Sequence, residues 1–166
     1  MNTLRCICRH LLSSLAITSC LIATAFAQED DIVGTWACGL SIDDPASGAA
    51  VKADFETTYD SDGSYTREGQ MDISIAPLQL EISVLMDEAG SWRVVESTAI
   101  GETASEIKIS ALSETPSQME QMIVQQMQTE SSGVIGQEEV AEITSLTADA
   151  MQLESPDGAS LSCDKA

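Results

Sequence analysis

The chain has 166 residues, of which 27 are acidic and seven are basic, and its formal net charge is −20. A surface this negative repels nucleic acid and anionic lipid headgroups, because binding either requires clustered cations. The charges are interspersed with regularly spaced apolar residues, which argues against disorder. Composition and length therefore indicate one folded acidic domain and exclude nucleic-acid binding.

Residues 1–27 have the organisation of a secretory signal peptide. Two arginines precede an apolar run, and the run ends in alanines at the −3 and −1 positions of a cleavage site after Ala27. We therefore expect a mature domain at 28–166, exported to the periplasm or secreted, without a transmembrane segment. An alternative is a lipid anchor on Cys20, because residues 17–20 resemble a bacterial lipobox.

The mature part has 27 acidic residues against five basic ones, a formal net charge of −22, and it retains only Cys38 and Cys163. Two thiols in an oxidising compartment predict one disulfide. A bridge across so long a loop contributes at most about 5 kcal/mol in the chain-entropy model. A redox-active pair is the alternative, but the C-x-x-C spacing is missing.

Most of the mature chain alternates apolar and polar residues with the period of two that is typical of half-buried strands. The first six strands are expected at 32–42, 51–59, 64–75, 78–86, 91–98 and 105–112. The segments "DDPASG" (43–48), "DSDG" (60–63) and "DEAG" (87–90) predict turns, and "AIGETA" (99–104) joins the last two of these strands. Residues 55–75 thus form a predicted hairpin.

The segment 115–130 has helical spacing instead. Thr115 is the expected N-cap, Pro116 suits the first helical position and Gln118 completes a capping box, so a helix is expected at about 116–130. Gly133 indicates its end. One stripe of this helix is apolar and is a candidate ligand lid or plug for one end of a barrel. The stripe consists of Met119, Met122, Ile123 and Met127.

Three further strands are expected at 138–146, 150–155 and 159–163, giving eight or nine in all. A disulfide requires Cα atoms within about 7 Å, so the bridge would place the first strand, with Cys38, beside the last, with Cys163. In a meander this adjacency closes a barrel and removes its exposed edges. The expected fold is all-β and mainly antiparallel, an up-and-down barrel of about eight strands with one helix before the last three.

Gly34-Thr35-Trp36 lies at the start of the first strand and resembles the G-x-W element of lipocalins. The resemblance implies a lipocalin-like barrel in which Trp36 packs under the closed end, against a basic residue of the last strand. Lys165 is the candidate for that residue. Two features depart from the family pattern: its second, T-D-Y-like motif is missing, and the helix precedes the last three strands. The chain is therefore similar to lipocalin-like exported bacterial barrels.

The chain after residue 27 contains no histidine. This excludes Ser-His and Cys-His nucleophiles and histidine metal sites. No phosphate-binding or dinucleotide-binding glycine loop is present. The "DSDG" turn fails as a calcium loop, since Thr58 and Gly69 stand where acids are needed. Met119 and Met122 form an M-x-x-M pair that suits Cu(I), although such a stripe is more typical of a core or lid.

We therefore expect no catalytic residues, no metal and no cofactor. The leading hypothesis is a non-enzymatic exported barrel that binds a small apolar or amphipathic ligand. The alternative is an acidic interaction or inhibitor module that docks a basic protein partner.

Overall fold

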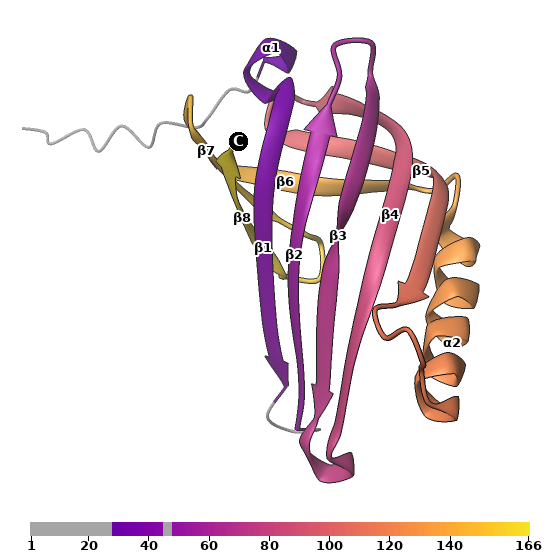
Figure 1. Ribbon diagram of the computed structural model, residues 1–166. Coiled ribbons are helices and arrows are strands. Elements are labelled where there is room, and N and C mark those ends of the chain that lie inside the picture. The colour runs from indigo at the N-terminus through magenta and orange to yellow at the C-terminus, as the bar shows by residue number, and fades with distance from the viewer. Residues whose placement is uncertain (1–27, 45–47) are drawn as a thin grey trace, which may run out of the picture.

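The computed structural model describes residues 28–44 and 48–166, and its strands form one closed antiparallel barrel in chain order (Figure 1). The strands are β1 (Gly34–Asp44), β2 (Ala49–Tyr59), β3 (Ser64–Ile75), β4 (Leu80–Val95), β5 (Ala99–Ala111), β6 (Glu138–Leu146), β7 (Ala150–Glu154) and β8 (Ser160–Lys165). The helices are α1 (Glu29–Ile32), η1 (Ala76–Leu78) and α2 (Gln118–Val134). The predicted all-β barrel, with one long helix before the last three strands, is confirmed. The predicted signal peptide, its cleavage site and Cys20 lie outside the described residues.

The barrel is closed by short stretches of pairing. β1 pairs with β8 only over residues 36–39, and β5 pairs with β6 only over residues 99–103. Cys38 and Cys163 face each other in the first of these ladders and form the predicted disulfide, with Cα atoms 4.0 Å apart. The disulfide thus links the two strands whose pairing closes the barrel.

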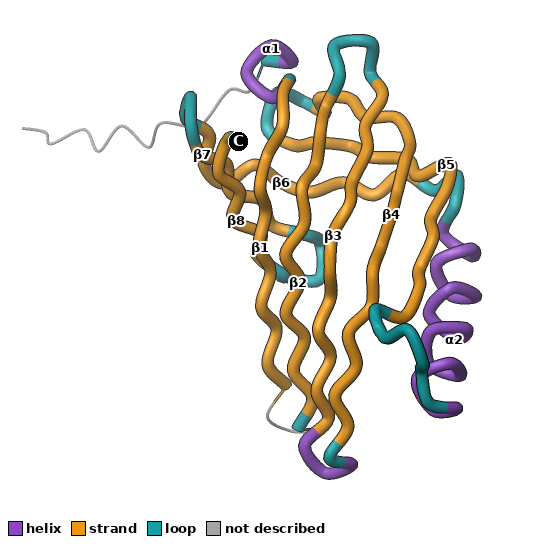
Figure 2. Tube along the Cα trace, in the orientation of Figure 1, coloured by secondary structure: helices purple, strands orange, loops and turns teal. Residues whose placement is uncertain are grey.

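β1 to β5 are longer than β6 to β8 and continue beyond the closed part as a five-stranded sheet (Figures 1 and 2). Residues 40–44 of β1 form one edge of this extension, and residues 104–111 of β5 form the other. The molecule therefore combines a closed barrel end with an open, curved sheet.

Large side chains fill the closed part. Trp36, Tyr59, Tyr65, Ile100 and Met151 are each at most 2% exposed, and the ring of Trp92 packs edge-on at 5.1 Å from that of Tyr59. Eight strands enclose a space just wide enough for side chains to fill. The closed part is therefore a packed core.

β4 runs unbroken where the sequence predicted a turn at 87–90. Its residues pair with β3 on one side and with β5 on the other, and a bulge at Ala89/Gly90 accommodates the local irregularity. The chain turns instead at Glu96 and Ser97, which have positive φ. The predicted link at 99–104 lies within β5. Two predicted strands thus merge into one, which leaves eight.

The start of α2 was predicted two residues too early. Ser117 is the N-cap: its Oγ accepts from the Glu120 N–H, and the Glu120 carboxylate accepts from the Ser117 N–H. The charged Glu120 carboxylate is a stronger acceptor for a backbone N–H than the neutral amide oxygen of Gln118. The capping box therefore forms at Ser117 and not at Thr115. Gly133 lies inside the helix rather than after its end. Within the described residues, no helix has the length and apolarity needed to cross a membrane.

α2 covers the edge of β5 that β6 leaves unpaired (Figure 1). The Gln128 side-chain amide donates to the Ile107 carbonyl at 2.9 Å and accepts from the Ile109 N–H at 2.8 Å. One side chain thus takes the place of a neighbouring strand. This protects an edge that would otherwise be open to pairing with another chain.

We predict that Gln128→Ala lowers the free energy of unfolding by about 1–2 kcal/mol, because two partly buried backbone groups lose their partner. Chemical denaturation measures the change. Gln125→Ala is the matched control, since it makes the same change at an exposed position of α2. Equal effects of the two substitutions would contradict this role for Gln128.

Candidate functional site

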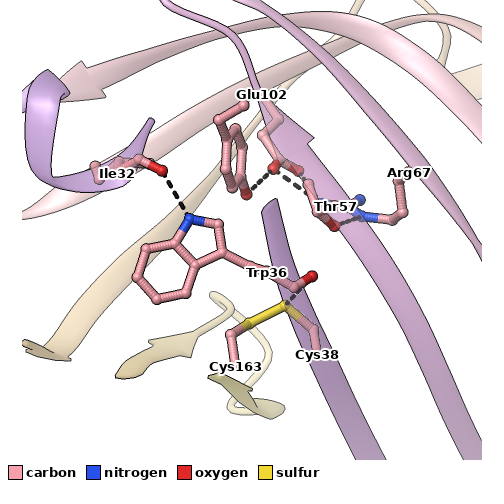
Figure 3. Close-up of a disulfide and its surroundings, with 8 residues drawn as sticks. Ile32, Trp36, Cys38, Thr57, Arg67, Glu102 and Cys163 are labelled. Carbon is pink, nitrogen blue, oxygen red and sulfur yellow. Dashed lines mark hydrogen bonds and ion pairs between the residues drawn. A yellow bond between two sulfur atoms is a disulfide. The ribbon is translucent and has the colours of Figure 1, made fainter. Parts of the chain in front are cut away.

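The G-x-W element begins β1, directly after α1, and its Trp36 lies beside Ile32 (Figure 3). The indole N–H of Trp36 donates to the Ile32 carbonyl at 2.7 Å, and the Ile32 side chain is fully buried. Lys165 Nζ lies 4.9 Å from the centre of the Trp36 ring. Gly34 has φ +131°, and a Cβ there would lie 3.0 Å from Lys165 Cε. Gly34, Trp36 and Lys165 therefore pack together at the start of β1.

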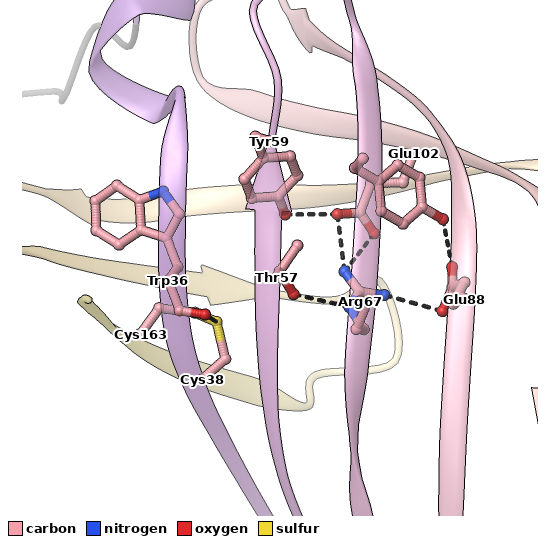
Figure 4. A network of polar contacts seen from close by, with 9 residues as sticks. Trp36, Cys38, Thr57, Tyr59, Arg67, Glu88, Glu102 and Cys163 are labelled. Carbon is pink, nitrogen blue, oxygen red and sulfur yellow. Dashed lines mark hydrogen bonds and ion pairs between the residues drawn. A yellow bond between two sulfur atoms is a disulfide. The ribbon is translucent and has the colours of Figure 1, made fainter.

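A polar network crosses the interior beside this core, centred on Arg67 of β3 (Figure 4). Arg67 Nη2 donates to both carboxylate oxygens of Glu102 at 2.8 Å, and Nη1 donates to Glu88 Oε2 at 3.3 Å. Its Nε donates to Thr57 Oγ1 at 3.1 Å. The guanidinium also lies 5.2 Å from the centre of the Phe55 ring, in cation–π contact. Four side chains therefore hold the Arg67 guanidinium in one position.

Two tyrosines complete the network. The Tyr59 hydroxyl donates to Glu102 Oε1 at 2.5 Å, and the Tyr65 hydroxyl donates to Glu88. Burial, followed by the charge of Glu102, raises the pKa of Tyr59 well above its usual value near 10. Burial and the hydrogen bond to Glu88 raise the pKa of Tyr65 in the same direction. Burial opposes the charge on Arg67, but Glu102 and its other partners outweigh this, so its pKa is also raised.

The network carries two carboxylates and one guanidinium, a formal charge of −1. The side chains of Arg67, Glu88 and Glu102 are 14%, 12% and 19% exposed. Among the described residues, no buried side-chain nitrogen or oxygen lacks a hydrogen-bond partner. The network is fully hydrogen-bonded and only partly screened by water.

Apolar side chains follow the network along the inner face of the sheet. On β4, Ile82, Val84 and Met86 precede Glu88 at alternate positions. All four side chains therefore point to the same side of the sheet. We define the open face as the incompletely buried inner-facing apolar residues beyond the network. The larger of them are Leu40, Ile42, Val51, Phe55, Met71, Ile73, Ile75, Leu80, Met86 and Ile109. The site thus has apolar walls with one polar cluster at its inner end.

A groove of about 480 Å³ lies between α2 and the end of β5, and Ile109, Ala111 and Val124 contribute to its lining. Of the residues predicted as a lid, Ile123 and Met127 are partly buried. Met119 and Met122 are 48% and 55% exposed. The structure therefore does not bring the four lid residues together around one cavity.

A second hollow, of about 540 Å³, lies on the outer face of the barrel. Ala37 and Gly39 are among the residues that line it. Carboxylates surround these small residues, namely those of Asp54, Glu56, Glu68 and Asp164. Across residues 28–44 and 48–166, no group of three or more acidic, cysteine or histidine side chains is arranged to hold a metal ion.

Comparison of the chain with protein-family models and with curated proteins finds no match. The assignment of a site therefore depends on the geometry alone. Sequence reasoning missed Arg67, Glu88 and Glu102. One signal was available: Arg67 alternates with Tyr65 and Ile73, which places a charged residue on the apolar face of its strand. Glu88 and Glu102 lay in segments predicted as a turn and a link.

We predict that neither tyrosine ionises near pH 10 while the protein is folded. The chain has only two tyrosines, and both have raised pKa values. A tyrosine in the unfolded chain ionises at about pH 10. Below that pH both states are neutral and folding is not penalised. Above it the unfolded state alone gains free energy by ionising, so the stability of the folded protein falls as the pH rises. Phenolate absorbance should therefore rise together with unfolding measured by tryptophan fluorescence. A tyrosine that titrates near pH 10 before unfolding would contradict this.

We predict that Arg67→Met lowers the free energy of unfolding at neutral pH by roughly 2–4 kcal/mol, because two mostly buried carboxylates lose their shared cation. Arg93→Met is the matched control, since Arg93 pairs with Glu138 on the surface, where water screens the two charges, and we expect a much smaller cost. Chemical denaturation at neutral pH measures both variants. A deficit equal to that of the control would contradict the prediction.

Proposed function

We propose that the protein is an exported, non-enzymatic, lipocalin-like binding protein for a small apolar or amphipathic ligand, and that the ligand lies on the open face. The observation that carries this proposal is the contrast between the two parts of the barrel. The closed part is packed with side chains at most 2% exposed, such as Trp36 and Tyr65. The strands then continue as a sheet whose inner face buries Val84 and Ile82 but leaves apolar residues around them, such as Leu40, Ile42 and Ile73, incompletely buried.

The composition of the site supports the proposal. Small-molecule sites are mostly apolar, with a few polar groups that fix the orientation of the ligand. The open face supplies the apolar surface and the Arg67 network supplies the polar groups. α2 borders the same region at the edge of β5, where it forms the 480 Å³ groove. We expect Ile123 and Met127, which are partly buried on α2, to shield a bound ligand from water.

The test is titration with a neutral, apolar fluorescent probe, N-phenylnaphthylamine. We expect saturable binding with one class of site and about five- to tenfold weaker affinity in Ile73→Gln, because the substitution places a polar amide on an apolar contact surface. Ser74→Gln is the matched control on the outer side of the same strand and should bind like the unmodified protein. Thermal unfolding verifies that both variants fold. Absence of binding, or equal affinities, would overturn the proposal.

A second candidate is docking of a basic protein by the acidic outer hollow around Ala37 and Gly39. The net charge of −22 in the mature chain would attract such a partner. This function predicts binding that salt weakens steeply and that is unaffected by Ile73→Gln. The two functions are therefore distinguishable with the same variant.

A further inference from the structure

We propose that the ligand of the open face is an amphiphile with a cationic head group, an amine or a guanidinium, which docks beside Glu88. This inference rests on the proposed function and specifies the class of ligand. It follows from the position of the network, its charge and the hydrogen bonds that its oxygens make.

The Glu88 carboxylate lies where the Arg67 network meets the apolar open face. It lies two residues from Met86 on the inner face of β4, so an apolar chain that contacts Met86 brings its head group next to Glu88. Phe55 lies on the same inner face and is partly buried, with its ring against the Arg67 guanidinium. An apolar chain and a polar head can therefore be accommodated in adjacent positions.

The charge of the network favours a cation. Arg67 is shared between two carboxylates, and its contact with Glu88 Oε2 is the longest in the network, 3.3 Å, against 2.8 Å to Glu102. Glu88 is thus the less strongly paired of the two. A second cation beside it would balance the formal charge of −1. Charge-assisted hydrogen bonds of this kind are about twice as strong as neutral ones.

The same charges disfavour an anionic amphiphile. A carboxylate or sulfate head would lie beside Glu88 in a region only partly reached by water, where like charges repel more strongly than in bulk solvent. The acidic surface of the mature chain would also repel it during approach. A neutral head group makes neither the favourable nor the unfavourable interaction, so its affinity should lie between those of the charged heads.

The experiment compares octylammonium, octanol and octanoate, which share one apolar chain, as competitors of N-phenylnaphthylamine. We expect affinity in that order, with at least a tenfold difference between the two charged heads. Glu88→Gln should weaken octylammonium five- to tenfold and change the affinity for octanol by a much smaller factor. Glu81→Gln is the matched control: it removes the same charge from the exposed outer face of the same strand, so any effect of total charge is equal in both variants.

The outcomes separate this inference from the proposed function. If octanol displaces the probe but octanoate binds as tightly as octylammonium, the cationic preference is wrong while the binding function stands. Equal effects of Glu88→Gln and Glu81→Gln would also overturn the inference, because the preference would then arise from total charge. If none of the three displaces the probe, this inference is wrong, while the proposed function still depends on the probe titration. Should Glu88→Gln fail to fold, Glu102→Gln tests the same network charge.

Discussion

The fold depends on a short ladder between its first and last strands. β1 and β8 pair only over residues 36–39, yet this pairing converts an eight-stranded meander into a barrel. Trp36 begins the ladder, and its indole is held by the Ile32 carbonyl and covered by Lys165. The Cys38–Cys163 disulfide ties the same two strands together. Without this ladder the sheet would have two more unpaired edges, which are sites for association with other chains.

The small extent of this closure determines the rest of the architecture. Because only part of β1 and β5 finds a partner strand in the barrel, their remaining residues extend into an open sheet. One edge of that extension needs protection, and α2 supplies it through the Gln128 amide. The packed closed end and the open face are therefore two results of one mismatch between long and short strands. The ion network lies between them, and beyond it the inner face combines buried residues such as Val84 with incompletely buried ones such as Met71 and Ile73.

Much of this fold could be predicted from the sequence, because the relevant signals are local or involve covalent chemistry. Alternation with a period of two identified the strands, and two cysteines at opposite ends indicated closure. The continuity of β4 could not be predicted, because Asp87 and Glu88 look locally like turn residues. Pairing with strands on both sides overrides that local preference. The network was missed for the same reason. A residue in a turn has no predicted direction, so Glu88 can be assigned to the inner face only when β4 is known to be continuous.

Stability alone does not account for a charged network at this position. A buried ion pair generally contributes no more to folding than apolar side chains of similar volume, because desolvation offsets the attraction between the charges. The adjacent layer of the barrel shows the alternative, with Ile100, Met151 and Leu153 packed in a buried hydrophobic cluster. Arg67 and its two carboxylates instead lie where the interior meets the open face. There they provide fixed charge and hydrogen-bonding groups at the end of an apolar surface, which is the arrangement that the proposed binding of an amphipathic ligand requires.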